Sequence, residues 1–286
     1  MEVFFQGGHG ISGLTSDDDG SVYVCSSESG DVLRVTDDGS GGGPAYDVFI
    51  NTGGVPRSVA FSSTGSAYFC DLAHQAVLMI GGAAEDGGGD GGGVFSIVVK
   101  DFDAKALLGP SSCCVDAAGT IFFTDSGPVG GSSLASPGGS VFRVDAQTQM
   151  LLPLALNCLA LPSAIALSPA ESVLYVAETM ANRVLRFVQQ PAGVYHFTVF
   201  AQFAGGLGPA ALAVAADGNV YVARADIRTA EGAVGVVDVL SPRGVLLASV
   251  EAPDGVCELA GLAITADGRV LVSDKQSNTI YSFPVV

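Results

Sequence analysis

The chain has 286 residues, of which 48% are hydrophobic and 14% are charged. This composition provides enough apolar side chains for a large core and too little charge for a disordered chain. The net charge of -17 argues against proteins that bind phosphate groups, because those proteins use clusters of Lys and Arg. We therefore expect no nucleic-acid partner and no membrane partner.

Residues 2–7 (EVFFQG) form the first apolar segment, and they allow two interpretations. They resemble LEVLFQGP, a protease recognition sequence of expression tags, which has to be excluded before a fold is argued. Val3, Phe4 and Phe5 are also residues that favour β-strands. The number of strands in the rest of the chain decides between these interpretations.

Six later segments share one pattern: a small or apolar start, an alternating strand, a tight turn and a second apolar strand. They begin roughly 50 residues apart, as propeller repeats do. The segments are 11–25 (ISGLTSDDDGSVYVC), 56–71 (PRSVAFSSTGSAYFCD), 110–125 (PSSCCVDAAGTIFFTD), 162–178 (PSAIALSPAESVLYVAE), 209–224 (PAALAVAADGNVYVAR) and 259–274 (LAGLAITADGRVLVSD).

Each copy continues with a third apolar strand, and five of the six continue with a fourth. Four short strands rich in Val, Tyr and Phe and separated by Gly turns indicate a propeller blade rather than a helical repeat. The sequence therefore predicts an all-β fold, a six-bladed β-propeller of four-stranded antiparallel blades, as a single domain over residues 1–286. The blades are expected at about 11–50, 55–100, 108–156, 160–203, 207–250 and 257–285 together with 1–6.

The sixth copy lacks a fourth strand, because few residues follow its third one. The N-terminal segment matches this vacancy: when Ile11 is aligned with Pro209, Phe5 falls on Phe203, at the end of a fourth strand. We therefore predict that residues 3–6 pair with the third strand of the last blade. This pairing would close the ring and remove two exposed sheet edges.

Segments 161–187 (LPSAIALSPAESVLYVAETMANRVLRF) and 260–283 (AGLAITADGRVLVSDKQSNTIYSF) resemble NHL repeats. The shared pattern is an apolar start with Pro, a DG turn, a strand that ends in an acidic residue, and a later Asn. The resemblance extends over essentially the whole chain and implies a six-bladed propeller. NHL-like propellers include protein-binding domains, RNA-binding domains and a few enzymes. The net charge disfavours the RNA-binding class, so the resemblance leaves protein-binding domains and enzymes open.

Ligands of such propellers are expected on the top face, defined here as the end of the channel where the first strand of each blade begins. The residue directly after each second strand lies there. These residues are Ser26, Asp71, Asp125, Glu178, Arg224 and Asp274. The four carboxylates could hold Ca²⁺, which prefers oxygen ligands. The sequence favours a structural role instead, in which each acidic side chain bonds the backbone of its own turn.

The loops that precede the first strands bring His9, Arg57 and Glu258 towards the top opening, and His74 follows Asp71 in a neighbouring loop. Catalytic zinc takes about three protein ligands, and the third histidine, His196, lies on an outer strand, so a zinc site is disfavoured. The candidate ligand-binding residues are His9, Arg57, His74, Asp125, Glu178, Arg224, Glu258 and Asp274, and the candidate metal ligands are Asp71, Asp125, Glu178 and Asp274.

The architecture also resembles calcium-dependent lactonase propellers and strictosidine-synthase-like propellers. Residues 252–262 (APDGVCELAGL) are similar to the Gly-rich loops ahead of the inner strands of those lactonases. The Glu-Gly-Pro start and the channel asparagines of those lactonases have no counterpart here. The start positions instead hold small residues, Ser12, Ser111, Ser163 and Ala210. No nucleophile motif such as G-x-S-x-G is present.

Two functions of different classes follow. The favoured one is a protein-binding or scaffolding module without a catalytic site, and the alternative is a Ca- or Zn-assisted hydrolase or lyase acting on a small molecule in the channel. We expect a monomer, no cofactor unless the carboxylates hold Ca²⁺, and a compartment that the sequence leaves open, with the cytoplasm slightly favoured.

Three further expectations concern loops and thiols. The long connections 126–139 and 225–233 should wall the top opening, and the Gly-rich segment 83–93 should be a flexible loop on the opposite face. The six cysteines lack zinc spacing and are expected to be reduced, mostly buried thiols.

Overall fold

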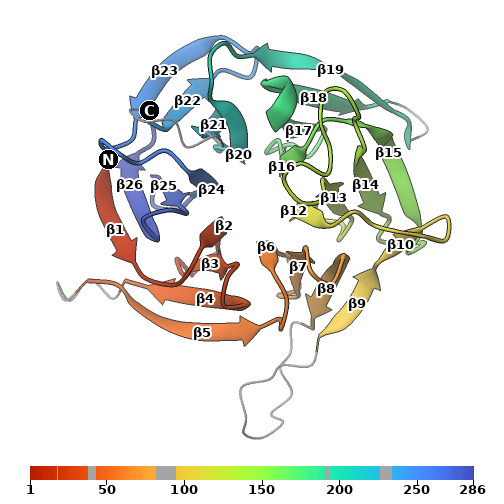
Figure 1. Cartoon of the computed structure of the whole chain (residues 1–286), viewed down its shortest axis with the longest axis horizontal. Coiled ribbons are helices and arrows are strands. Elements are labelled where there is room, and N and C mark those ends of the chain that lie inside the picture. Colours follow the sequence, from red (N-terminus) through yellow and green to blue (C-terminus); the bar gives the residue numbers. More distant parts are fainter. Residues whose placement is uncertain (18, 38–42, 82–94, 191–192, 226–233) are drawn as a thin grey trace, which may run out of the picture.

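Six four-stranded antiparallel sheets are arranged as blades around a central axis (Figure 1). The computed structural model describes residues 1–17, 19–37, 43–81, 95–190, 193–225 and 234–286. The prediction of an all-β six-bladed propeller is confirmed. Within the described residues the helical content is one turn of 3-10 helix, Thr179–Ala181, and no helix there has the length and hydrophobicity needed to cross a membrane.

The strands of each blade follow one another from the axis to the rim. Blade 1 holds β2 (Ile11–Ser16), β3 (Val22–Ser26), β4 (Asp31–Thr36) and β5 (Ala45–Asn51). Blade 2 holds β6 (Pro56–Phe61), β7 (Ala67–Asp71), β8 (Ala76–Ile80) and β9 (Ser96–Val99). Blade 3 holds β12 (Pro110–Val115), β13 (Ile121–Asp125), β14 (Gly139–Val144) and β15 (Leu151–Leu159).

The second half of the ring repeats this order. Blade 4 holds β16 (Pro162–Leu167), β17 (Val173–Glu178), β18 (Arg183–Gln189) and β19 (Tyr195–Gln202). Blade 5 holds β20 (Gly208–Val214), β21 (Val220–Ala225), β22 (Val236–Leu240) and β23 (Leu246–Glu251). Blade 6 holds β24 (Leu259–Ile264), β25 (Arg269–Asp274), β26 (Thr279–Pro284) and, as its rim strand, β1 (Glu2–Gln6).

The N-terminal segment closes the ring, as predicted. β1 pairs antiparallel with β26, with Glu2 opposite Ser282 and Gln6 opposite Thr279, and the two ends of the chain lie close together in Figure 1. The Asn278 side chain strengthens the junction, because its Oδ1 accepts the Gly10 N–H at 2.7 Å. The segment is therefore part of the fold, whatever its resemblance to a protease site.

The hydrophobic core consists of six clusters, one between each pair of neighbouring blades. Between blades 6 and 1, for example, Phe5 and Ile280 pack against Val24 and Leu33. Each blade is thus buried on both faces, which explains why the second strands are apolar throughout rather than alternating.

Near the axis the blades approach so closely that only glycine fits at some positions. A Cβ atom on Gly13 of β2 would collide with the Arg57 backbone of β6, and one on Gly261 of β24 would collide with the Ser12 backbone. These contacts fix the inner strands of blades 6, 1 and 2 against one another.

One short element was not predicted. A hairpin of two two-residue strands, β10 (Asp101–Phe102) and β11 (Lys105–Ala106), lies between blades 2 and 3. The segment predicted as a flexible loop at 83–93 lies outside the described residues, as does most of the long connection predicted at 225–233.

Candidate functional site

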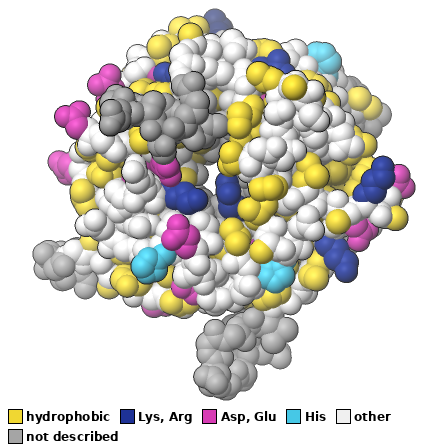
Figure 2. Space-filling model, in the orientation of Figure 1, with side chains coloured by type: hydrophobic (Ala, Val, Ile, Leu, Met, Phe, Trp, Pro, Cys, Tyr) yellow, Lys and Arg dark blue, Asp and Glu magenta, His cyan; other side chains and the backbone are white. Residues whose placement is uncertain are grey.

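A cavity of about 900 Å³ occupies the channel and is lined by residues from the inner strands of all six blades. Figure 2 shows that the top face is hollowed at its centre, with Lys or Arg side chains at the edge of the hollow. Small-molecule sites in proteins are typically concave and of about 300–1,000 Å³. The channel is therefore the place to look for bound ligands.

The inner strand of every blade is irregular near its start. In blade 2, Pro56 pairs with Asp71 and Ser58 with Cys70, so that Arg57 is left as an extra residue. Such β-bulges redirect side chains and are common next to active sites. The corresponding bulge residues, all of which line the cavity, are Ser12, Arg57, Ser111, Ser163, Ala210 and Ala260. We call this set the bulge ring.

Most of the bulge ring is small and already bonded. Ser111 Oγ donates to the Ser163 carbonyl at 3.2 Å, and Ser163 Oγ donates to the Pro209 carbonyl at 3.3 Å. These hydroxyls join blade 3 to blade 4 and blade 4 to blade 5. Arg57 is the exception, because it places a long cationic side chain where the other blades have Ser or Ala.

Arg57 is partly buried and has no carboxylate partner among the described residues. Burial lowers the pKa of its guanidinium, because desolvation disfavours the charged form. Its electrostatic neighbours are the thiols of Cys25 and Cys70. Burial raises the pKa of both thiols, so they are neutral and supply no counter-charge.

Two further charged residues, Glu258 and Lys275, line the cavity at its top end. Their backbones are joined by a hydrogen bond from the Lys275 N–H to the Glu258 carbonyl at 3.0 Å. Sequence reasoning identified Glu258 and missed Lys275. The signal that could have identified Lys275 is its place directly after Asp274, at the top end of a second strand.

Of the predicted loops, 126–139 contributes to the cavity through Val129, whose side chain is exposed at the opening. At the opposite end of the channel the lining residues include two carboxylates, Asp17 and Asp19. The cationic side chains that line the described cavity are thus confined to the top half.

The acidic residues after the second strands are buried and bonded to their own blades. Asp71 accepts the Val55 N–H at 3.1 Å, and Asp274 accepts the Glu258 N–H at 2.9 Å. Asp125 accepts the N–H groups of Leu108 and Gly109 at 2.9 and 2.8 Å. Burial raises the pKa of Asp125, and these two donors only partly oppose the effect. None of these carboxylates lines the cavity.

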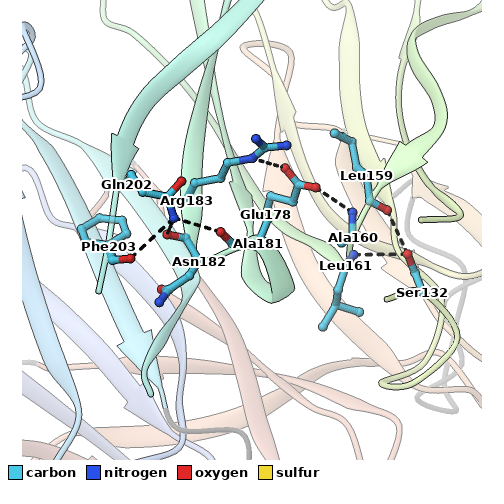
Figure 3. A network of polar contacts seen from close by, with 10 residues as sticks. All are labelled: Ser132, Leu159, Ala160, Leu161, Glu178, Ala181, Asn182, Arg183, Gln202 and Phe203. Carbon is cyan, nitrogen blue, oxygen red and sulfur yellow. Dashed lines mark hydrogen bonds and ion pairs between the residues drawn. The ribbon is translucent and has the colours of Figure 1, made fainter. Parts of the chain in front are cut away.

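Glu178 has the same role within a larger network, shown in Figure 3. Its Oε1 accepts the Ala160 N–H at 2.8 Å, and its Oε2 lies 2.6 Å from Arg183 Nε. The neighbouring residue Leu161 donates its N–H to Ser132 Oγ at 3.3 Å. Glu178 therefore holds the loop before blade 4, and Ser132 ties the 126–139 connection to the same loop.

The remaining candidates lie away from the channel lining. Arg224 Nε lies 2.7 Å from Asp238 Oδ2, and its guanidinium stacks over the Phe203 ring at 5.0 Å. His74 Nδ1 lies 3.0 Å from Asp71 Oδ1. His9 is exposed, and its backbone N–H donates a hydrogen bond to Ser26 Oγ. Of the predicted site residues, the structure brings Arg57 and Glu258 into the cavity.

The six cysteines are free thiols. Four are buried, Cys114 is half-buried and Cys158 is exposed. Cys113 lines the cavity, but it is 7% exposed and accepts or donates a hydrogen bond with Ser58 Oγ at 3.5 Å.

Comparison with known proteins places the chain. Residues 59–260 match the family described as the SMP-30/Gluconolactonase/LRE-like region. The chain belongs to this family. The match covers inner strands from β6 to β20 and reaches the start of β24, and so includes most of the channel wall.

Among the known proteins similar to this chain, lactonase drp35 of Staphylococcus aureus (strain MW2) is 25% identical over 218 residues. The matched part is 74% of this chain and 63% of that lactonase, so the chain spans less than two thirds of the relative's length. Two solved structures share the fold. A gluconolactonase from Xanthomonas campestris has a TM-score of 0.78 at 19% identity, covering 99% of this chain and 89% of its own. A regucalcin from Agrobacterium tumefaciens has a TM-score of 0.76 at 17% identity, and the match covers 99% of this chain and 92% of the regucalcin.

These findings correct the functional prediction. The propeller architecture is confirmed, but the family is SMP-30/gluconolactonase rather than NHL. The predicted protein-binding or scaffolding role is wrong, and so is the predicted protein or peptide partner. The family match and the named relatives point instead to enzymes that act on small molecules. The NHL-like features are the turn and strand chemistry of a propeller blade, which these families share.

The Agrobacterium regucalcin is described as a calcium-binding protein, which raises the question of whether this channel fits a cation. Calcium takes six to eight oxygen ligands. The bulge ring offers bonded hydroxyls and one guanidinium, which repels a cation. In the described part of the chain, no group of three or more His, Cys, Asp or Glu side chains is placed to hold a metal. The described residues do not fit a resident calcium ion, and no step below involves one.

Proposed function

We propose that this member of the SMP-30/gluconolactonase family hydrolyses a small lactone or ester that binds in the central channel. The observation that carries the proposal is the cavity of about 900 Å³ with Glu258 and Lys275 at its top end. The named lactonase and gluconolactonase relatives support the same class of reaction.

The chemistry assigns one role to each of these residues. Hydrolysis needs a base that takes a proton from water as the water attacks the carbonyl carbon. Glu258 is the carboxylate that lines the cavity at this end, and it serves as that base. The carbonyl oxygen becomes negative during the attack, and the Lys275 ammonium stabilises this charge.

The second step completes the reaction. The bond between the carbonyl carbon and the ring or ester oxygen breaks, and the departing oxygen takes the proton back from Glu258. The product is a hydroxy acid when the substrate is a lactone. Water is the only co-reactant.

The test is turnover of five- and six-membered lactones and matched open-chain esters, followed by acid release at constant pH. We expect the wild-type chain to hydrolyse members of this set and Glu258→Gln to lower kcat by about 10²–10⁴-fold. Glu251→Gln, at an exposed site on β23, is the matched control and should leave kcat unchanged. Wild-type rates no higher than the uncatalysed background, or a fully active Glu258→Gln variant, would contradict the proposal.

A further inference from the structure

Arg57 is a cation that the fold holds inside the channel without a counter-ion in the described chain. It stands on the bulge ring, so the irregular strand start directs it towards the cavity. Five equivalent positions carry Ser or Ala, which shows that the blade itself does not need a long side chain there. Arg57 therefore has no evident structural role.

An unpaired buried charge destabilises a protein, because its hydration is lost and nothing replaces it. The titratable groups that act electrostatically on Arg57 are Cys25 and Cys70, buried thiols whose pKa values are raised by burial. Asp71, on the neighbouring strand of the same blade, already accepts hydrogen bonds from Thr52, Val55 and His74. An anion that entered the channel would supply the missing charge.

Arginine suits oxyanions such as carboxylate and phosphate. Its planar guanidinium offers parallel N–H donors that match the two oxygens of a carboxylate. The cavity around it is lined by hydroxyls and small apolar side chains, which suit the body of a small organic molecule. Lys275 and Glu258 line the same end of the channel with opposite charges, so Arg57 leaves that end with a net positive charge.

We propose that Arg57 binds a carboxylate group of the channel ligand. The inference deepens the proposed function and rests on it for the identity of the ligand: the substrate is a lactone or ester that carries a free carboxylate of its own. The channel is an anion site, held by a guanidinium at one bulge position, rather than a cation site.

The test measures binding without turnover, by calorimetry, for three carboxylates and their neutral analogues: acetate and acetamide, benzoate and benzamide, gluconate and glucitol. We expect the wild-type chain to bind at least one acid ten or more times more tightly than its neutral analogue. Arg57→Ser should abolish this preference. It introduces the residue that three other blades carry, so the fold should be retained.

Two controls accompany it. Arg34→Ser removes the same charge from an exposed ion pair with Asp47 and should leave the preference unchanged. Arg57→Lys keeps the positive charge but lacks the parallel N–H donors of the guanidinium, and it should retain part of the preference. In the absence of ligand, Arg57→Ser should raise the melting temperature by a few degrees, since it removes an uncompensated charge.

The outcomes separate this inference from the proposed function. Binding of none of the three acids, or an equal preference in wild type and Arg57→Ser, would overturn the anion site. A carboxylate preference that depends on Arg57, in a chain that hydrolyses no lactone or ester, would support the anion site and overturn the hydrolase. Lactone turnover that Arg57→Ser leaves unchanged would support the hydrolase and overturn the anion site.

Discussion

At the scale of single residues, the second-strand carboxylates show how local chemistry can be read from a sequence. Each recurs at the same place in its repeat, next to a turn with free N–H groups, so a bond to that turn was a natural expectation. The structure gives Asp71, Asp125 and Asp274 such donors. The channel lining was harder to predict, because a bulge depends on how two strands pair and leaves no mark on one strand alone.

Glu178→Ala should destabilise the fold markedly. The change leaves the buried Ala160 N–H without an acceptor and Arg183 without its ion pair. We expect a loss of about 2–3 kcal/mol in the free energy of unfolding, measured by urea denaturation. Glu251→Ala, at an exposed position, should change it by less than about 0.5 kcal/mol. Equal effects of the two changes would argue against the network in Figure 3.

Tyr23 makes stability depend on alkaline pH. Burial, together with the Asp17 carboxylate, raises the pKa of Tyr23 to about 12 from 10.0. Between these values the unfolded chain has lost the phenol proton and the folded chain has kept it, so the free energy of unfolding falls as the pH rises. We expect Tyr23→Phe to remove roughly 1 kcal/mol of this fall at pH 11, allowing for solvent screening. Parallel pH profiles for both chains would refute the shift.

At the scale of strands, the closing strand could be predicted because the six repeats contain only five fourth strands. Short apolar runs and the turns between them located the first three strands of each blade, since every blade buries both faces. The strand ends at the rim were less certain, because rim strands such as β5 and β23 are largely exposed and show weak patterning. The hairpin of β10 and β11 was missed because two-residue strands carry no periodicity.

Phe5→Ala tests the closing strand directly. Phe5 is 5% exposed, packs in the cluster between blades 6 and 1, and meets the Tyr46 ring edge-on at 5.4 Å. Truncation of a buried Phe costs about 3–5 kcal/mol, which we expect to see as a lower melting temperature. Val3→Ala, on the same strand but 64% exposed, is the control. A chain indifferent to Phe5→Ala would mean that β1 is dispensable for the ring.

At the scale of the whole molecule, the propeller provides a channel whose chemistry is set by one residue from each blade. The sequence predicted the ring and brought Arg57 and Glu258 to its opening. It could not weigh them correctly, because the NHL-like pattern reflects blade geometry and is silent about what fills the axis. The family match over residues 59–260 indicates the class of protein, which the repeat pattern alone could not.

Calcium should not stabilise this chain beyond a general ionic effect. Among the described residues no group of three or more acidic side chains is placed to hold a metal, and the cations that line the top end are Arg57 and Lys275. We expect melting temperatures in 1 mM CaCl₂, in 1 mM MgCl₂ and in EDTA at matched ionic strength to agree within about 1 °C. Magnesium is the control for screening of the -17 charge. A rise specific to calcium would contradict the assignment of the channel to anions.

The pairing of β1 with β26 should be a late step in folding. The two strands lie at opposite ends of the sequence, with Glu2 opposite Ser282, and among the described strand pairings this one closes the longest loop. Closing so long a loop costs more chain entropy than any pairing within a blade. We therefore expect amide protons of β1 to gain protection from pulsed hydrogen exchange after those of blades 2 to 5, and simultaneous protection would contradict this order. Until that last step the molecule is an open arc with two unpaired edges, and a chaperone or a second copy of the chain could intercept it there.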